Sequence, residues 1–248
     1  MVISSIITVA LLVICSVFVK KQSQREFVLK ASAILTVIIH FSNLPVNFFL
    51  TGGNAYIESN HILPVWPCNI IMWMLLVCAM LGNKKSVLFH LFADFCFYAG
   101  IVCSVVGIAF NSNFDANPTL ADYDVLKGLV SHSVMLFGCI YLYVGKFIKI
   151  RVFNTLGLTV GFSIFVICGI SVNAIYRAFG MTPPDAMLLE SNPYIPISPI
   201  ILGILAVLVL FAILAIYEMR LPKEDRWYSI ARNYFNEEHW FTKLGHHL

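Results

Sequence analysis

The sequence predicts an all-α, polytopic membrane protein with seven transmembrane helices, its N-terminus outside and its C-terminus cytoplasmic. The first observation is composition: 59% of the 248 residues are hydrophobic and 12% are charged, whereas soluble domains carry roughly 25% charged residues. The second is a series of apolar segments, each close to the roughly 20 residues that a bilayer core requires. The third is an alternation of charge between successive connections. Together these observations place the chain in a cell membrane.

The apolar segments follow one another with short connections. They cover residues 2–19, 27–50, 62–81, 87–110, 125–145, 152–176 and 197–217. Residues 1–219 therefore form one transmembrane domain. Residues 220–248 form a cytoplasmic tail whose aromatic and basic side chains fit a helix lying on the inner membrane surface, with an ordinary solvated tail as the alternative.

Charge in the connections sets the predicted orientation. Basic residues occupy the first, third and fifth connections and the tail: Lys20, Lys21, Arg25, Lys84, Lys85, Lys146, Lys149, Arg151, Arg220, Lys223, Arg226, Arg232 and Lys243. The other connections carry Asp and Glu, with only Lys127 and Arg177 at their edges. By the positive-inside rule the first group is cytoplasmic. The net charge is +3, and the charged residues are clustered in the loops. No stretch has the basic, polar character that nucleic-acid binding requires.

Residues 63–69, which read LPVWPCN, open the third apolar segment. Proline suits the first position of a helix, and the residue before a proline is pushed out of helical geometry. We therefore expect a helix to begin at Pro67, with Trp66 outside it and Cys68 in its first turn. The helix dipole and free N–H groups there favour a thiolate, which would make Cys68 nucleophilic. The alternative is that Cys68 is a small buried hydrophobe.

Polar residues gather in the outer half of the predicted spans. At 1.5 Å per residue, Cys68 lies roughly 9 Å and His132 roughly 10 Å inside the outer boundary. Residues at a similar level or slightly further out are His40, Asn43, Asn47, Asn69, Ser131, Asn173 and Arg177. Polar groups in hydrocarbon usually face the protein interior or a water-filled cavity, so we expect a polar pocket that opens outward. Pro45 predicts a kink in the second span at this level.

Several of these residues have a structural interpretation as well. His40 is also consistent with a hydrogen-bonded core histidine, and Asn43 and Asn47 with interhelical hydrogen bonding. Arg177 suits an interfacial anchor or a lipid phosphate site, and Ser131 is a rival nucleophile.

Two other patterns favour structure over function. His90 and Asp94 share a helix face, but no further ligand stands at a diagnostic spacing, so a structural pair is favoured over a metal site. Gly157 and Gly161 are spaced for close helix packing. The sequence predicts no metal and no cofactor.

Three runs, LPVWPCNIIMWMLLV, SHSVMLFGCIYLYV and NAIYRAFGMTPPDAM, resemble the YwaF family of bacterial integral membrane proteins, which is related to the eukaryotic transmembrane protein 164 acyltransferases. The resemblance implies that Cys68 is the acyl-carrying nucleophile and His132 its base, and it carries over Asn173 from the third run. It also implies the bacterial plasma membrane. This sequence differs from the family's usual L-P-L-H-L-C motif, because Val65, Trp66 and Pro67 replace the three middle residues.

The leading hypothesis is a membrane-embedded, phospholipid-dependent transacylase that works through a thioester on Cys68. A pocket at the depth of the outer-leaflet esters makes a membrane phospholipid the expected acyl donor. The acceptor is a lysolipid, a lipoprotein or another envelope molecule, and with water as acceptor the same site is a lipase. Asn69, Asn43 or free N–H groups at the start of the third span would stabilise the oxyanion, and His40 would orient His132. The alternative is a non-enzymatic small-solute transporter or receptor-like binding protein, although no inverted repeat supports transport.

Overall fold

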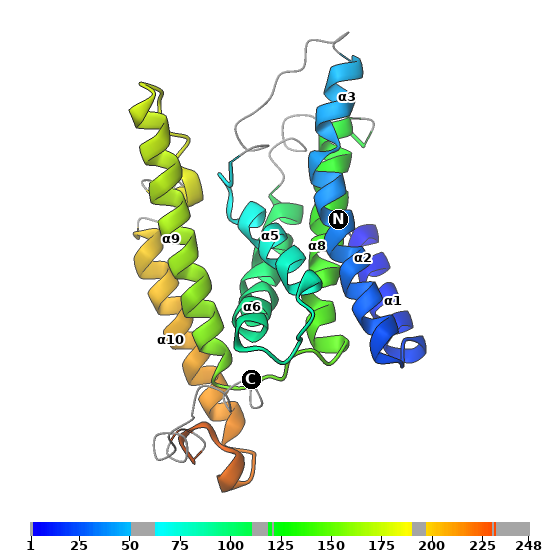
Figure 1. The fold of residues 1–248 in the computed structure, drawn as a ribbon, viewed down its shortest axis with the longest axis vertical. Helices are drawn as coiled ribbons and strands as arrows, with labels where there is room; N and C mark the ends of the chain where they lie inside the picture. Colours follow the sequence, from blue (N-terminus) through cyan, green and yellow to red (C-terminus); the bar gives the residue numbers. More distant parts are fainter. Residues whose placement is uncertain are drawn as a thin grey trace. The chain divides into compact units, whose positions relative to one another are not determined.

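The computed structural model describes residues 2–50, 63–110, 119–120, 122–189, 197–229 and 231. These residues form helices joined by short connections, and no strand occurs among them. The chain divides into two compact units (Figure 1). The first contains Met1–Met80 and Cys96–Lys146, and the second contains Leu81–Phe95 and Phe147–Leu248. The predicted 1–219 domain therefore has helices in both units.

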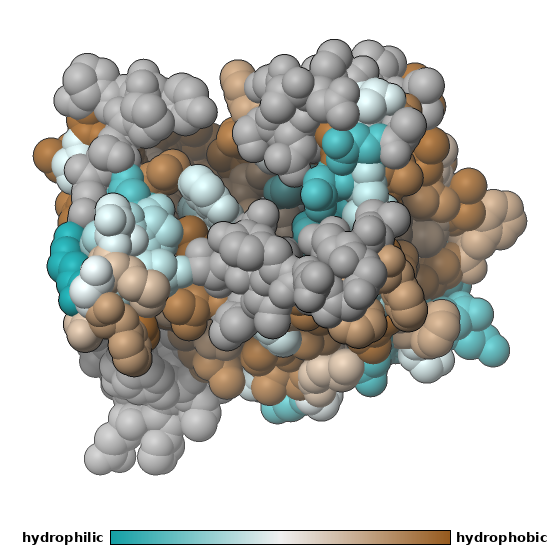
Figure 2. All heavy atoms as spheres, turned by 90° about the horizontal axis from the view of Figure 1, so that it is seen from above, coloured by the Kyte–Doolittle hydropathy of each residue, from teal (hydrophilic) through white to brown (hydrophobic). Residues whose placement is uncertain are grey.

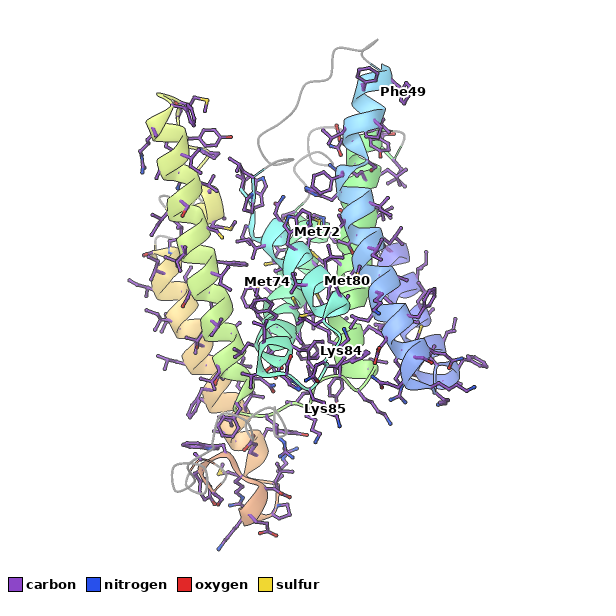
Figure 3. All side chains as sticks on the ribbon, viewed as in Figure 1. Phe49, Met72, Met74, Met80, Lys84 and Lys85 are labelled. Carbon is purple, nitrogen blue, oxygen red and sulfur yellow. The ribbon has the colours of Figure 1, made fainter. Side chains whose placement is uncertain are left out.

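The first unit is a helical bundle built on α2. Its helices are α1 (Val2–Phe18), α2 (Gln22–Phe41), α3 (Asn43–Leu50), α5 (Pro67–Met80), the second half of α6 (Val87–Ala109) and α8 (Tyr123–Val144). α2 packs against α8 and α5, and α1 packs against α8. Met72 and Met74 of α5 are buried, whereas Met80 at its end is exposed; all three are labelled in Figure 3, with Lys84 and Lys85 in the turn that follows.

The second unit is built on α9. It contains the first half of α6, α9 (Asn154–Ala178), the short helix η1 (Ala186–Leu188), α10 (Pro199–Glu218) and η2 (Lys223–Asp225). The predicted close packing at Gly157 and Gly161 is confirmed. A Cβ atom on Gly157 would lie 2.7 Å from the Leu91 carbonyl oxygen, and one on Gly161 would lie 1.9 Å from the Phe95 ring. Only glycine lets α9 approach α6 this closely.

Among the described residues, five helices are long and apolar enough to cross a membrane: Gln22–Val46, Val87–Ala109, Tyr123–Val144, Asn154–Ala178 and Pro199–Glu218. The apolar helices Ser4–Phe18 and Pro67–Met80 are shorter. An all-α, multi-pass membrane protein is consistent with these helices. The count of seven spans and the orientation stay predictions.

The predicted start of the third segment is confirmed, because α5 begins at Pro67 with Trp66 outside it. The kink predicted at Pro45 stays a prediction. Ser42, between α2 and α3, keeps a right-handed helical backbone (φ −65°, ψ −18°), and Gln22–Val46 forms one 25-residue helical span. Pro45 lacks the N–H that would bond to the carbonyl group of Phe41, so the helical hydrogen bonding loses one bond in this turn. The hydroxyl of Tyr123 on α8 donates to the Ser42 hydroxyl at 2.6 Å, which ties this turn to α8.

The chain after α9 folds back along that helix. The Ala186 N–H donates to the Asn173 side-chain oxygen at 2.9 Å. A Cβ atom on Gly169 would meet the Ala186 carbonyl oxygen at 2.9 Å. Gly169 stands nine residues before the end of α9, roughly 13 Å back along its axis. Non-helical backbone at such a depth needs internal hydrogen-bond partners, and Asn173 supplies one.

Glu218, at the end of α10, is almost fully buried and joins three parts of the second unit. One carboxylate oxygen accepts from the Val152 N–H and the other from the Trp227 N–H, both at 2.7 Å. Hydrogen bonds to a buried charge are among the stronger ones in proteins. Most of the tail predicted to lie on the membrane, residues 230 and 232–248, is outside the described residues.

Candidate functional site

The first turn of α5 joins Cys68 to a histidine of α2 through Asn69. The Cys68 thiol donates a weak hydrogen bond of 3.7 Å to the Asn69 side-chain oxygen. The amide nitrogen of Asn69 lies 3.4 Å from Nε2 of His40. An amide nitrogen can only donate, so Nε2 of His40 is the acceptor here. Asn69 is buried, and it therefore couples the thiol to an imidazole on another helix.

His132 is held by its own helix on one side and by α6 on the other. Nδ1 lies 2.8 Å from the Gly128 carbonyl oxygen, one turn earlier in α8. Because a carbonyl oxygen only accepts, Nδ1 carries the hydrogen and Nε2 is the basic nitrogen. The ring lies on Gly107 of α6, where a Cβ atom would be 2.3 Å from both Nε2 and Cδ2. Gly107 thus makes the space that the imidazole occupies.

Lys127 is a charged residue of α8 that is linked to Asp124 through Asn43. Its ammonium donates to the Asn43 side-chain oxygen at 2.7 Å. The Asn43 amide nitrogen in turn donates to an Asp124 carboxylate oxygen at 3.1 Å. Lys127 is within electrostatic range of Cys68 and His132, but burial has the larger influence on both groups.

The helix α6 lies against His132 at Gly107. Cys103, one turn before Gly107, is within electrostatic range of Cys68. Within the part of the chain that the structure describes, no hydrogen bond joins Cys68 directly to His132, and none joins His40 to His132. His40, predicted to orient His132, lies beside Asn69. Asn69 itself, predicted as an oxyanion donor, bridges Cys68 and His40.

The other predicted residues have separate surroundings. Ser131 donates its hydroxyl to the Gly128 carbonyl oxygen at 3.1 Å, an interaction within its own helix. The Asn47 side chain lies outside what the structure describes. Asn173 and Arg177 belong to the second unit, where Asn173 is buried against Ala186 and Arg177 is exposed.

No group of three or more His, Cys, Asp or Glu side chains that could hold a metal occurs among the described residues. Asp94 is fully buried at the first turn of α9, beside Gly157. His90 is also buried, one turn earlier on α6. Both belong to the second unit.

Sequence reasoning missed Lys127, Asp124 and Gly107. Lys127 and Asp124 were assigned to a connection and its edge, although α8 begins at Tyr123 and contains both. Their spacing carries a signal, because residues 124, 127 and 131 recur at three and four positions and so share one helix face. No sequence signal indicates that Gly107 underlies His132.

The chain matches no family model, no curated protein and no solved structure in comparisons with known proteins. The surroundings of Cys68 and His132 therefore carry the functional conclusion.

Proposed function

We propose that the protein is a membrane-embedded acyltransferase, a phospholipid-dependent transacylase that uses Cys68 as nucleophile and His132 as base. The observation that carries the proposal is the hydrogen-bonded setting of the thiol. Cys68 lies in the first turn of α5 and donates to buried Asn69, whose amide nitrogen lies 3.4 Å from Nε2 of His40. A helix start and a nearby imidazole are features that can activate a cysteine nucleophile.

The reaction has two balanced steps. Nε2 of His132 takes the thiol proton, and the sulfur of Cys68 attacks an ester carbonyl of the phospholipid. The bond to the glycerol oxygen breaks, and that oxygen recovers the proton from His132, which leaves a thioester and a lysophospholipid. The acceptor hydroxyl or amine then gives its proton to His132 and attacks the thioester, and the sulfur leaves as a thiol. Catalytic hydrogen bonds are often long without substrate and tighten when it binds.

The proposal includes seven spans, with the N-terminus outside and the site in the outer leaflet of a bacterial plasma membrane. α5 has 14 residues and is about 21 Å long, shorter than the roughly 30 Å hydrocarbon core. The four non-helical residues before it add less than their fully extended length of about 13 Å, because the Val65 N–H bonds back to the Leu63 carbonyl oxygen at 2.8 Å. We expect the third segment to cross the bilayer with Cys68 below the outer boundary.

Intact-mass measurement of the purified protein after rapid mixing with phospholipid tests this function. We expect an acyl adduct on the wild type that hydroxylamine removes. Cys78→Ser, a change at a fully buried cysteine of the same helix, should keep the adduct, and Cys68→Ser should lose it. His132→Ala should slow its formation by about 10²- to 10⁴-fold, more than His40→Ala does.

A wild type without adduct, in which Cys68 is no more reactive toward a thiol probe than Cys78, would overturn the nucleophile assignment. That result would favour the alternative, a small-solute transporter or receptor-like binding protein. One observation supports this alternative: the non-helical entry to α5 brings irregular backbone next to the polar side chains of Cys68 and Asn69. Transporters commonly build substrate sites from broken helices.

A further inference from the structure

We propose that the carboxyl group of Asp94 is a proton-binding site inside the second unit, and that His90, one turn earlier on α6, exchanges the proton with it. Cys68 and His132 belong to the first unit. The proton site is therefore separate from the proposed acyl-transfer site and does not depend on that function.

The first step is the burial of the carboxyl group. Asp94 is 0% exposed, and neither of its side-chain oxygens has a hydrogen-bond partner of normal geometry among the described residues. It lies seven residues from the start of α6 at Val87, or about 10 Å along the helix. An ionised carboxylate without such partners is far more costly to bury than a neutral acid. The carboxyl group therefore carries a proton.

The second step is the contact with α9, which allows the proton to leave. A Cβ atom on Gly157 would lie 2.7 Å from the Asp94 Cβ atom, so the carboxyl group is next to the first turns of α9. Asn154, the first residue of α9, is buried and interacts with this carboxyl group. An amide N–H and the positive end of a helix dipole both stabilise a carboxylate. The ionised form can thus exist for the short time that exchange requires.

The third step is the exchange partner. His90 is 6% exposed, and its Nδ1 has no hydrogen-bond partner among the described residues. Residues four apart share one face of a helix, and His90 stands between Asp94 and the start of α6. Transfer breaks the O–H bond of Asp94 and forms an N–H bond on Nδ1 of His90. The product is a carboxylate and an imidazolium, with the total charge unchanged.

Other charged groups surround the pair without replacing His90. Lys149, which is exposed, acts on His90, and its positive charge disfavours an imidazolium, so the proton returns to the carboxyl group. Arg151 gives its main-chain N–H to the side-chain oxygen of Asn154 at 2.5 Å. The Lys84 ammonium lies 5.3 Å from the centre of an aromatic ring of α6. Glu218 of α10 has both oxygens bonded to backbone N–H groups, and the first two turns of α9 contain no titratable residue.

The position of the pair within a candidate membrane span gives it functional weight. Hydrophobic residues cover much of the coloured surface in Figure 2, as expected of helices that face lipid. α6 is one of the candidate spans, and Asp94 is the one acidic residue in it. Ionisable residues inside spanning helices mark routes for protons and ions.

The test is infrared spectroscopy of the full chain in a detergent that has no carbonyl group. A protonated carboxyl has its own C=O stretching band, separate from the bands of carboxylates. We expect the wild type to show this band at neutral pH, shifted in deuterated water and shifted again by an isotope label on the carboxyl carbon of aspartate. Asp94→Asn should lose the band, whereas Asp124→Asn, a change at a half-buried aspartate of α8, should keep it.

The role of His90 is tested by the rate at which the band shifts after transfer into deuterated water. His90→Phe keeps a ring of similar size, and His90→Gln keeps a hydrogen-bonding group, but neither can carry the proton. Both should slow the exchange by about 10²-fold, the lower end of what a positioned acid or base contributes. Thermal unfolding checks that each variant is folded.

Three outcomes would overturn the proposal. The first is a wild type in which the aspartate label shifts no carboxylic-acid band, and the second is a folded Asp94→Asn that keeps the band. The third is unchanged exchange in both His90 variants, which would refute the exchange role. Asp94 is the only buried aspartate among the described residues, so the label on the wild type decides the matter even where Asp94→Asn does not fold.

Discussion

Gly107→Ala is expected to displace the imidazole of His132. The new methyl carbon would lie 2.3 Å from Nε2 and Cδ2 of the ring, whereas ordinary contact begins at 3.4 Å. The ring must therefore retreat by about 1.1 Å. Its retreat is resisted by the 2.8 Å hydrogen bond from Nδ1 to the Gly128 carbonyl oxygen, which is worth about 1 kcal/mol. Overpacking of this kind costs about 1–3 kcal/mol in total.

Helix propensity acts in the opposite direction. Replacing an interior helical glycine with alanine stabilises a helix by up to about 1 kcal/mol. The net change in unfolding free energy of Gly107→Ala is thus small, about 0–2 kcal/mol. Acyl transfer is more sensitive, because a misplacement of about 1 Å at a catalytic group can lower the rate about 10²-fold. We expect a folded protein whose acyl adduct forms about two orders of magnitude more slowly.

A double-mutant cycle separates the steric effect from propensity. In the His132→Ala background the ring is absent, so Gly107→Ala should stabilise the protein by its propensity alone. The coupling energy between the two positions, from denaturant unfolding in detergent, should be about 1–3 kcal/mol. Gly203→Ala, whose Cβ atom would have no neighbour closer than 3.6 Å, is the control for a glycine with room. An identical effect of Gly107→Ala in both backgrounds would refute the placement of His132 on Gly107.

Two further predictions concern the second unit. Asn173→Ala leaves the buried Ala186 N–H without its acceptor and should lower the unfolding free energy by about 1–3 kcal/mol in denaturant titration; an unchanged midpoint would contradict the folded-back segment. Glu218→Gln keeps one acceptor oxygen and replaces the other with an NH₂ group, which cannot accept from the Trp227 or Val152 N–H. The free energy of unfolding should therefore fall by about 1–3 kcal/mol. The exposed Glu224→Gln is its control, and equal thermal shifts for the two variants would count against the buried role of Glu218.

Local covalent geometry made parts of the fold predictable. A proline has a fixed φ and no N–H, so the start of α5 at Pro67 and the weak turn before Pro45 follow from sequence. The glycine pair at Gly157 and Gly161 predicted a close helix contact, which α6 provides. Each of these features depends on a few neighbouring atoms.

The hydrogen-bond partners of the polar side chains were harder to predict from the sequence. Asn69 was expected to stabilise an oxyanion, which stays a prediction, and its contacts with Cys68 and His40 were not foreseen. Lys127 was expected at the edge of a loop, yet it binds Asn43 of α3. In soluble proteins the apolar stripe of a helix indicates its inward face, but membrane helices are apolar toward lipid as well as toward their neighbours. The sequence therefore says little about which face of a helix turns inward.

The sequence by itself predicted a membrane protein, its helical segments and the helix start at Pro67, because composition, segment length and proline geometry act locally. The tertiary structure decided that Gly107 makes room for His132, that Asn43 relays Lys127 to Asp124, and that Asn173 serves Ala186 in the second unit. These contacts join residues distant in the chain, and they depend on the rotation of each helix about its axis. That rotation is set by packing between side chains, which no single segment encodes.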